Sequence, residues 1–253
     1  MRLLIAIPVH NERKYVSAVL EKVRHFHAGD VLVIDDGSTD GTSEVLAATP
    51  GIHRLRHPVN RGYGQSLIDA FAYADRHEYD WVLTMDCDEQ HEPERIPDFV
   101  REIETDRWDL ISGSRYMEAR EDNDLPPTDR RRINATITAL INQELNLNLT
   151  DAFCGYKAHR VEAMRRVQLD EAGYAFPMQL WPQVVAAGFR ITELPVRLIY
   201  NDPNRSFGGH LDDANNRLKH YLQVFNDQMR RAFPAGVREP VAAVESCSCC
   251  CAK

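Results

Sequence analysis

Apolar residues along the first 115 positions follow two alternating spacings. Residues 2–7, 31–34, 81–85 and 110–112 form short, almost continuously apolar runs, as expected for strands of a sheet that is covered on both faces. The segments between these runs carry apolar residues three and four positions apart, which predicts helices. The predicted helix faces are Val16, Val19, Leu20 and Val23; Leu67, Ala70, Phe71 and Ala74; and Ile96, Phe99, Val100 and Ile103. This alternation predicts an α/β fold with a mostly parallel sheet flanked by helices.

The second half of the chain predicts more helix than strand. Residues 191–200 predict a late strand, and Pro195 favours an edge position because proline cannot donate a hydrogen bond to a neighbouring strand. The polar stretch 116–128 predicts a mobile loop. Residues 234–253 show no periodicity and predict a disordered, cysteine-rich tail. The predicted helix faces are Ile133, Ile137, Leu140 and Ile141, and Leu211, Leu218, Leu222 and Phe225.

Composition limits the classes of function that are open to this chain of 253 residues. Its formal net charge of −8 argues against a nucleic-acid-binding protein, which normally presents a basic face. The longest apolar run, residues 3–9, is far too short to span a membrane, and the polar residues after it argue against a signal peptide. We therefore expect a cytoplasmic protein without a transmembrane segment. Cys87 and Cys154 are expected to be buried thiols, and the oligomeric state stays open.

Two of the apolar runs end at pairs of carboxylates: Asp35 with Asp36, and Asp86 with Asp88. Ligands of open α/β sheets bind at the carboxyl ends of parallel strands, so we expect both acidic clusters side by side in one crevice. Alternate residues that leave a strand point the same way, so the second pair can approach one cation, with Gln90 adding a carbonyl oxygen. Such donors suit Mg²⁺ or Mn²⁺, which can hold a diphosphate. A tight turn at the first pair and an exposed acidic loop at the second are the simpler alternatives.

Residues 8–12 (PVHNE) follow the first predicted strand and precede the first predicted helix. Backbone N–H groups at such a helix start face the crevice and favour negatively charged ligands. Capping of the helix by Asn11 or Glu12 is the alternative interpretation.

These segments belong to a longer series of motifs that occur in a fixed order. The motifs are IPVHNE at 7–12, VIDDGSTDGT at 33–42, NRGYG at 60–64, MDCDEQH at 85–91, GSRY at 113–116 and GY at 155–156. Together they resemble family 2 glycosyltransferases, and the last two resemble the branch typified by dolichol-phosphate mannosyltransferase. The likeness extends over residues 2–225 and is strongest before Tyr116.

The resemblance implies a GT-A fold, a Rossmann-like arrangement, in a single domain of residues 1–233. Residues 1–115 would form the nucleotide-sugar-binding half, and residues 116–233 a helix-rich acceptor half. The implied nucleotide-sugar contacts are Pro8, Asn11, Glu12, Asp35, Asp36, Gly62 and Asp86, and the implied metal site is Asp86, Asp88 and Gln90. The implied catalytic residues are Asp88, Arg115, Arg130 and Arg205; Arg130 lies near Asn134 at an acceptor-phosphate position, and Arg205 matches a basic residue near the donor.

The resemblance also implies an inverting transfer of a hexose, either mannose or glucose, from a nucleotide sugar such as GDP-mannose or UDP-glucose. An acceptor hydroxyl needs a general base, whereas an acceptor phosphate does not, and arginines suit phosphate. We therefore expect a polyprenyl phosphate acceptor, met by a peripheral enzyme at the cytoplasmic face of the membrane. A hydroxyl acceptor, with Asp151, Asp170 or Glu171 as the base, and a non-catalytic nucleotide-sugar-binding protein are the alternatives.

Overall fold

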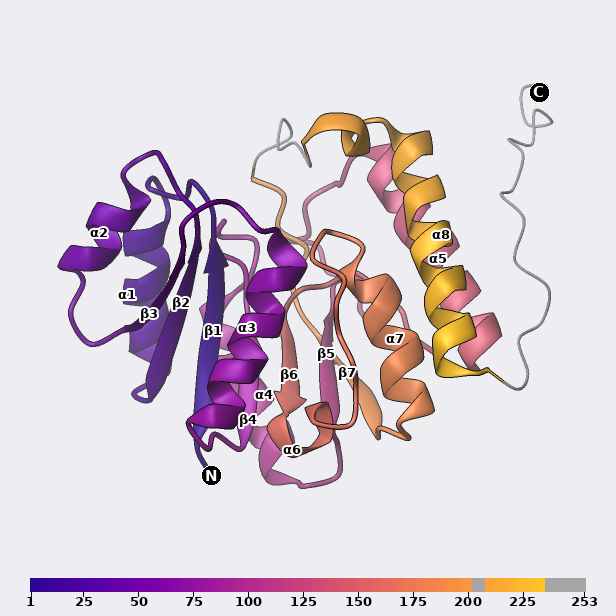
Figure 1. Ribbon diagram of the computed structural model, residues 1–253, viewed down its shortest axis with the longest axis horizontal. Helices are drawn as coiled ribbons and strands as arrows, with labels where there is room; N and C mark the ends of the chain where they lie inside the picture. The colour runs from indigo at the N-terminus through magenta and orange to yellow at the C-terminus, as the bar shows by residue number, and fades with distance from the viewer. Residues whose placement is uncertain (202–207, 235–253) are drawn as a thin grey trace.

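A seven-stranded sheet of order β3-β2-β1-β4-β6-β5-β7 forms the centre of the computed structural model, which describes residues 1–201 and 208–234 (Figure 1). Strand β6 is antiparallel to its neighbours β4 and β5, and every other neighbouring pair is parallel. The prediction of an α/β fold with a mostly parallel sheet is confirmed. The strands are β1 (Leu3–Val9), β2 (Asp30–Asp36), β3 (His53–His57), β4 (Trp81–Thr84), β5 (Leu110–Ser114), β6 (Lys157–Arg160) and β7 (Ile191–Pro195).

Helices cover both faces of the sheet and create two apolar clusters. Because side chains alternate along a strand, Ile5 and Ile7 of β1 pack against α1, α2 and α4, whereas Leu4 and Ala6 face the cluster that contains α3 and α5 to α8. Within the described residues, no helix has both the length and the apolar character needed to cross a membrane. The helices are α1 (Val16–Phe26), α2 (Thr42–Ala48), α3 (Tyr63–Arg76), α4 (Ile96–Glu104), α5 (Thr128–Leu145), α6 (Val161–Met164), α7 (Phe176–Ala186) and α8 (Ala214–Ala232), with the 3₁₀ turns η1 (Pro93–Arg95) and η2 (Gly209–Asp212).

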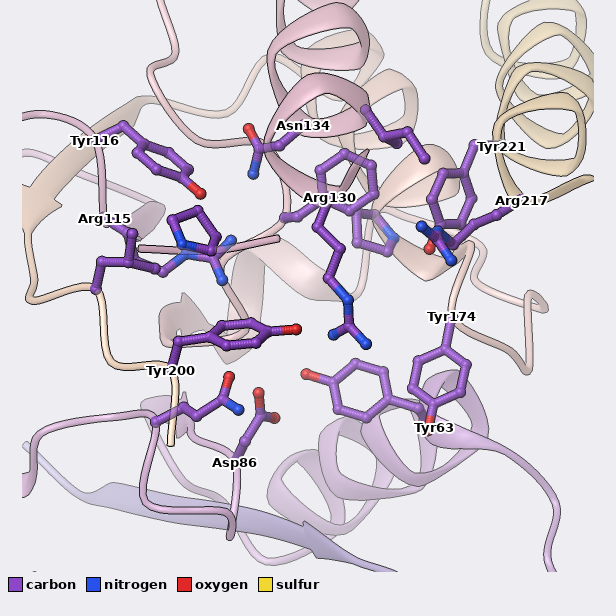
Figure 2. A pocket seen from close by; sticks show the side chains of 16 residues that line it. Tyr63, Asp86, Arg115, Tyr116, Arg130, Asn134, Tyr174, Tyr200, Arg217 and Tyr221 are labelled. Carbon is purple, nitrogen blue, oxygen red and sulfur yellow. The ribbon is translucent and has the colours of Figure 1, made fainter. Parts of the chain in front are cut away.

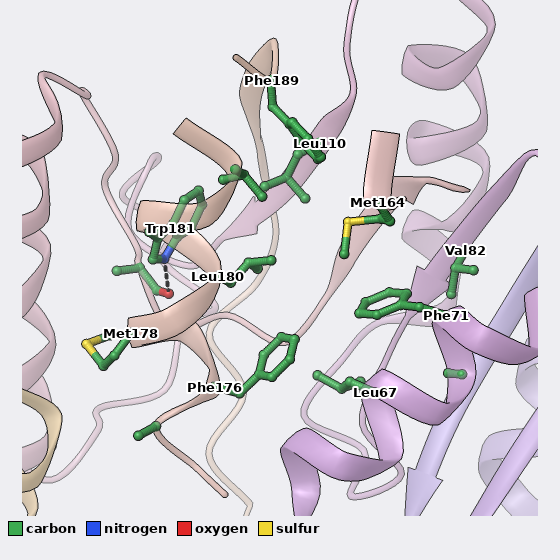
Figure 3. Packing of buried hydrophobic residues seen from close by; sticks show 14 of the residues in the cluster. Leu67, Phe71, Val82, Leu110, Met164, Phe176, Met178, Leu180, Trp181 and Phe189 are labelled. Carbon is green, nitrogen blue, oxygen red and sulfur yellow. Dashed lines mark hydrogen bonds between the residues drawn. The ribbon is translucent and has the colours of Figure 1, made fainter. Parts of the chain in front are cut away.

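Two strands and one long helix were absent from the sequence expectation. Strand β3 (HRLRH) has only His57 buried and lies at the sheet edge, and β6 (KAHR) is equally polar in sequence, so neither shows an apolar run. Helix α7 is apolar nearly all round, because it is enclosed between the sheet and α8, and it therefore lacks an amphipathic stripe. Figure 3 shows Phe176 and Leu180 of α7 packed towards Leu67 and Phe71 of α3.

The last strand is shorter than the expected 191–200, because the chain leaves the sheet after Pro195. Beyond that point it bonds to the loop after β5: Asp124 N–H donates to Leu198 O (2.9 Å), and Leu198 N–H donates to Asn123 Oδ1 (2.9 Å). Strand β7 is at the sheet edge, so the edge position expected from the proline is confirmed. The helical spacing places Leu211 in the last helix, but Leu211 belongs to η2, because α8 begins at Ala214.

Candidate active site

The loops after β1, β3 and β4, together with the end of β2 and the start of α3, line a pocket of about 630 Å³, which we call the strand-end pocket. The two acidic clusters, expected side by side in one crevice, stand at the ends of β2 and β4, with β1 between these two strands. They nevertheless contribute to the same pocket wall. The predicted residues in that wall are Pro8, Asn11, Glu12, Asp36, Gly62, Asp86 and Asp88.

The loops after β1 and β2 are fastened to each other by hydrogen bonds. The Asn11 N–H donates to Ser38 Oγ (3.0 Å), and Asn11 Oδ1 accepts from the Thr39 N–H (2.8 Å). The Glu12 N–H donates to Thr42 Oγ1 (2.9 Å). These bonds join two loops and do not cap α1, which has no side-chain cap, so the capping interpretation is wrong. They hold Asn11 and Glu12 in the wall of the strand-end pocket.

Asp36 organises the turn that precedes α3. Its carboxylate accepts from the N–H groups of Arg61 (2.7 Å) and Gly62 (2.8 Å), and it bonds His57 Nδ1 (2.6 Å). A buried carboxylate with several donors holds its neighbourhood rigidly. Asp36 therefore fixes where α3 begins at the edge of the strand-end pocket.

Asp35 lies on the opposite face of β2, because consecutive strand residues point to opposite faces. Its carboxylate accepts from the Ser38 N–H (3.0 Å) and from the Ser43 hydroxyl. It lines a separate pocket between α2 and β3, beside Arg56, rather than the strand-end pocket. Its contact with a nucleotide sugar stays a prediction.

The predicted metal residues follow β4, which ends at Thr84. Asp86 lines both the strand-end pocket and a second pocket beside it, which is described below. Asp88 lines the strand-end pocket and is 5% exposed. Gln90 lines the second pocket and not the strand-end pocket. The described residues contain no cluster of three or more histidine, cysteine or acidic side chains that could hold a metal. Two carboxylates with an amide nevertheless fit a cation such as Mg²⁺, which keeps waters and completes its shell with substrate phosphates.

His91 holds the start of this loop, a role that the sequence did not indicate. The Asp86 N–H donates to His91 Nδ1 (2.9 Å), and the ring stacks on Tyr156 with a centroid distance of 5.1 Å. Burial lowers the pKa of His91 to about 4, so the ring is neutral near pH 7. Because Nδ1 accepts a hydrogen bond, the ring proton sits on Nε2, which lies 3.7 Å from Asp86 Oδ2.

Tyr63 supports the Asp86 carboxylate from the first turn of α3. Burial, together with the adjacent Asp86 carboxylate to which it hydrogen-bonds, raises the pKa of Tyr63 well above its ordinary value, so the hydroxyl is a donor. The Tyr63 ring stacks on Tyr174 with a centroid distance of 5.9 Å. Gly155 leaves room for the contact between Tyr63 and Asp86, because a Cβ at position 155 would lie 2.6 Å from the Tyr63 hydroxyl and 3.0 Å from Asp86 Oδ2.

A second pocket of about 200 Å³ adjoins the strand-end pocket and shares Tyr63, Asp86 and Tyr174 with it. We call it the arginine pocket because three arginines line it. Figure 2 shows these side chains around one cavity; they come from the residue that follows β5, from α5 and from α8. The remaining lining residues are Gln90, Arg115, Tyr116, Pro126, Arg130, Ile133, Asn134, Phe153, Pro177, Leu198, Tyr200, Arg217 and Tyr221.

Arg115 is clamped against a fully buried carboxylate. Its Nε donates to Asp151 Oδ2 (2.6 Å), a second guanidinium nitrogen donates to Asp151 Oδ1 (3.0 Å), and Asn134 Nδ2 also donates to Oδ1 (2.8 Å). Burial by itself raises the pKa of Asp151, but the guanidinium and these hydrogen bonds outweigh it and bring the pKa down to about 2. Asp151 therefore stays ionised and holds Arg115 in a defined orientation.

Arg130 and Arg217 reach the pocket from different helices. Arg130 extends from α5 towards Tyr200, with 5.4 Å between the guanidinium carbon and the ring centroid (Figure 2). Arg217 is 3% exposed and donates to Asp129 Oδ2 (2.7 Å) and Leu211 O (2.8 Å). Arg217 was not expected at the site, because in sequence it is one of several charged residues on α8. The predicted catalytic Arg205 lies outside the described residues.

The proposed bases for a hydroxyl acceptor do not reach the arginine pocket. Asp151 is fully buried beneath Arg115, and neither Asp170 nor Glu171 lines the arginine pocket or the strand-end pocket. Gln179 is buried and holds the 170–171 segment by accepting both of its N–H groups (2.8 and 2.7 Å). Among the described residues that line the arginine pocket, Asp86 is the sole carboxylate.

Comparisons with known proteins identify relatives of this chain. The profile of glycosyl transferase family 2 matches residues 4–168. An undecaprenyl-phosphate mannosyltransferase of Micrococcus luteus is 32% identical over 224 residues, which cover 85% of this chain and 91% of the relative. A polyprenol monophosphomannose synthase of Mycolicibacterium smegmatis is 29% identical over 204 residues, which cover 77% of this chain and 76% of the relative.

Solved structures share the fold. Glucosyl-3-phosphoglycerate synthase of Mycobacterium tuberculosis, crystallised with Mn²⁺, uridine diphosphate and phosphoglyceric acid, superposes with a TM-score of 0.68 at 20% identity. The superposition covers 90% of this chain and 78% of that chain. The predicted GT-A fold is thereby confirmed. With the family profile matched over residues 4–168, the chain belongs to glycosyl transferase family 2 and is a glycosyltransferase.

Proposed function

We propose that this protein is a divalent-cation-dependent, inverting mannosyltransferase whose acceptor is a polyprenyl phosphate. The observation that carries the proposal is the arginine pocket: Arg115, Arg130 and Arg217 line it, and Asp86 is the sole carboxylate among its described lining residues. A phosphate acceptor is already an anion, so it needs arginines and no general base. The undecaprenyl-phosphate mannosyltransferase and the polyprenol monophosphomannose synthase to which this chain is similar support the same acceptor class and sugar.

In the proposed reaction the two pockets hold the two substrates. The strand-end pocket takes the nucleotide, with the diphosphate beside Asp86 and Asp88, where a bound Mg²⁺ or Mn²⁺ would neutralise charge on the departing nucleoside diphosphate. Asp86 lines both pockets, so the sugar would lie at their junction beside Tyr63 and Tyr174. Arg115, oriented by Asp151, then holds the acceptor phosphate for attack on the anomeric carbon from the face opposite the leaving group.

GDP-mannose is the proposed donor and UDP-glucose the competing one. The enzyme would work as a peripheral protein at the cytoplasmic face of the membrane, where a polyprenyl phosphate presents its head group. This placement follows from the acceptor class that the arginine pocket favours.

The proposal is tested by comparing a polyprenyl phosphate with the corresponding polyprenol as acceptors, using labelled GDP-mannose or UDP-glucose with Mn²⁺. We expect mannose transfer to the phosphate alone. Arg130→Ala should raise the KM for the acceptor about tenfold or more with little change in donor KM, because one charged hydrogen-bond donor to phosphate is lost. The control is Arg132→Ala on the same helix, since Arg132 is exposed and lines neither pocket.

Two outcomes would contradict the proposal. Transfer to the polyprenol at the same rate would indicate a hydroxyl acceptor and an unidentified base. Binding of nucleotide sugars without transfer to either acceptor would favour the non-catalytic alternative.

A further inference from the structure

Three exposed apolar side chains belong to, or directly flank, the lining of the arginine pocket. In the part of the chain that the structure describes, the exposed large hydrophobic residues are Met1, Val59, Met117, Leu125 and Tyr174. Tyr174 lines the arginine pocket, and Met117 and Leu125 directly adjoin Tyr116 and Pro126, which also line it. Leu125 is 92% exposed and Met117 is 48% exposed. Exposed apolar side chains that flank the lining of a pocket offer a surface to an apolar partner.

The exposure of Leu125 is imposed by the surrounding structure. The segment before it is held against residues 197–200: Asp124 N–H donates to Leu198 O (2.9 Å), and the Tyr200 N–H donates to Asp124 Oδ2 (2.8 Å). Asp122 O accepts from Arg197 Nε (2.7 Å). Pro126 and Pro127 follow at once and restrict the backbone further. The chain therefore presents Leu125 to solvent from a fixed position.

The walls of the arginine pocket continue the apolar character of its rim. Ile133, Leu198 and Pro126 line the same cavity as the arginines. A ligand with a phosphate at one end and a hydrocarbon chain at the other would place its phosphate against Arg115, while its chain follows these side chains towards the rim at Leu125. The pocket lining therefore offers both arginines for the phosphate and apolar side chains for the hydrocarbon.

Charges around the rim are mixed. Arg131 and Arg132 are exposed at the start of α5, and Glu118 and Glu121 are exposed on the loop. Arg131 also stacks on Tyr116, with 3.9 Å between the guanidinium carbon and the ring centroid. The segment 116–127 itself is net acidic, because Asp122 and Asp124 add to the two glutamates and Arg120 is its one base. Binding to a lipid surface would therefore depend on insertion of the apolar side chains and not on attraction to anionic lipid.

We propose that residues 116–127 form a membrane-docking loop, in which Met117 and Leu125 insert into the bilayer surface and bring the rim of the arginine pocket to the head groups. This inference rests on the proposed function, because it assigns the position from which a membrane-bound acceptor enters. The occupant is the lipid surface itself, and another protein at this loop is the competing outcome.

The test replaces both side chains with polar ones of similar size, Met117→Gln with Leu125→Gln. The control is Val59→Gln, because Val59 is 65% exposed, lies on the loop between β3 and α3, and lines neither the arginine pocket nor the strand-end pocket. Each protein is sedimented with phosphatidylcholine vesicles, with and without an anionic lipid. Transfer is then measured to a long polyprenyl phosphate in vesicles and to a water-soluble phosphate of two isoprene units.

We expect the double variant to bind vesicles at least fivefold more weakly and to use the vesicle acceptor with a correspondingly higher KM. Its kcat/KM for the water-soluble acceptor should equal that of the wild type, and Val59→Gln should resemble the wild type throughout. Vesicle binding of the double variant equal to wild type, or an equal loss in the control, would overturn the docking loop. If the wild type binds vesicles but glycosylates neither phosphate, the proposed function is wrong. The difference in vesicle binding between the wild type and the double variant still shows whether residues 116–127 dock to the membrane.

Discussion

At the scale of single residues, the Asp86 carboxylate is oriented by two groups that lie outside the acidic motif. The Tyr63 hydroxyl donates to it, and His91 accepts from its backbone N–H. Groups that orient a metal ligand commonly change metal affinity 10–100-fold when removed. The carboxylates alone therefore do not account for the metal site that we propose.

Removing the Tyr63 hydroxyl tests this support. In Tyr63→Phe the ring still stacks on Tyr174, but Asp86 loses a donor, so we expect half-saturation with Mn²⁺ to need about tenfold more metal. The measurement is a Mn²⁺ titration of the initial transfer rate. The control is Tyr174→Phe, which keeps the ring stack between positions 63 and 174 and the hydrogen bond from Tyr63 to Asp86. An unchanged Mn²⁺ requirement in Tyr63→Phe would remove the hydroxyl from the metal site.

At the scale of elements, the Arg115–Asp151 pair joins β5 to the segment before β6, and Asn134 connects both to α5. Three segments of the chain thus meet at one ion pair, and its carboxylate, Asp151, is fully buried. Breaking such a pair leaves a buried charge without compensation. The pair therefore supports the stability of this region as well as the position of the arginine.

The pair predicts a specific dependence of stability on pH. The pKa of Asp151 is about 2 in the folded protein and 3.8 ordinarily, so the stabilisation is complete above about pH 4 and is lost as the pH falls towards 2. The difference corresponds to about 2 kcal/mol of unfolding free energy. Urea unfolding between pH 5 and 2.5 should show this loss in the wild type and in an Asp227→Asn control, which changes an exposed acid. It should be absent in Asp151→Asn, and an equal slope in that variant would contradict the assignment.

At the scale of the whole molecule, the two pockets stay adjacent because the start of α3 lies against the loop before α7. The Gln65 N–H donates to Ala172 O (3.1 Å), and the approach is so close that a Cβ on Gly64 would lie 2.1 Å from Glu171 O. This contact brings Tyr63 and Tyr174 together at the junction of the strand-end and arginine pockets. The division into halves at residue 115 stays a prediction.

Gly64→Ala tests this contact. The added Cβ meets backbone atoms, which cannot rotate away, so we expect a loss of about 1–3 kcal/mol in unfolding free energy. Transfer should fall by more than donor binding does, since the two pockets move relative to each other. Urea unfolding and nucleotide-sugar titration measure the two effects, and a fully stable, fully active variant would show that the halves are not coupled here.

The sequence predicts those helices and strands whose buried residues form a regular apolar pattern along the chain. Continuous apolar runs identify β1 and β2, because these strands are buried on both faces. Helical spacing identifies α1, α3 and α4, because each of these helices buries one defined face. The polar β3 and β6 and the enclosed α7 had no such signature. Asp35 and Asp36 were assigned together, yet the pleat of β2 sends them to different pockets.

By itself the sequence determined the family, the α/β fold and the acidic motif, because these depend on residues that are neighbours along the chain or recur with a local period. The tertiary structure alone brought Arg217 to Arg115 and Arg130, placed Tyr63 and Gly155 around Asp86, and buried Asp151 beneath an arginine 36 positions away. Such contacts join segments that are distant in the chain. Packing sets their distances, and no local pattern in the sequence encodes them.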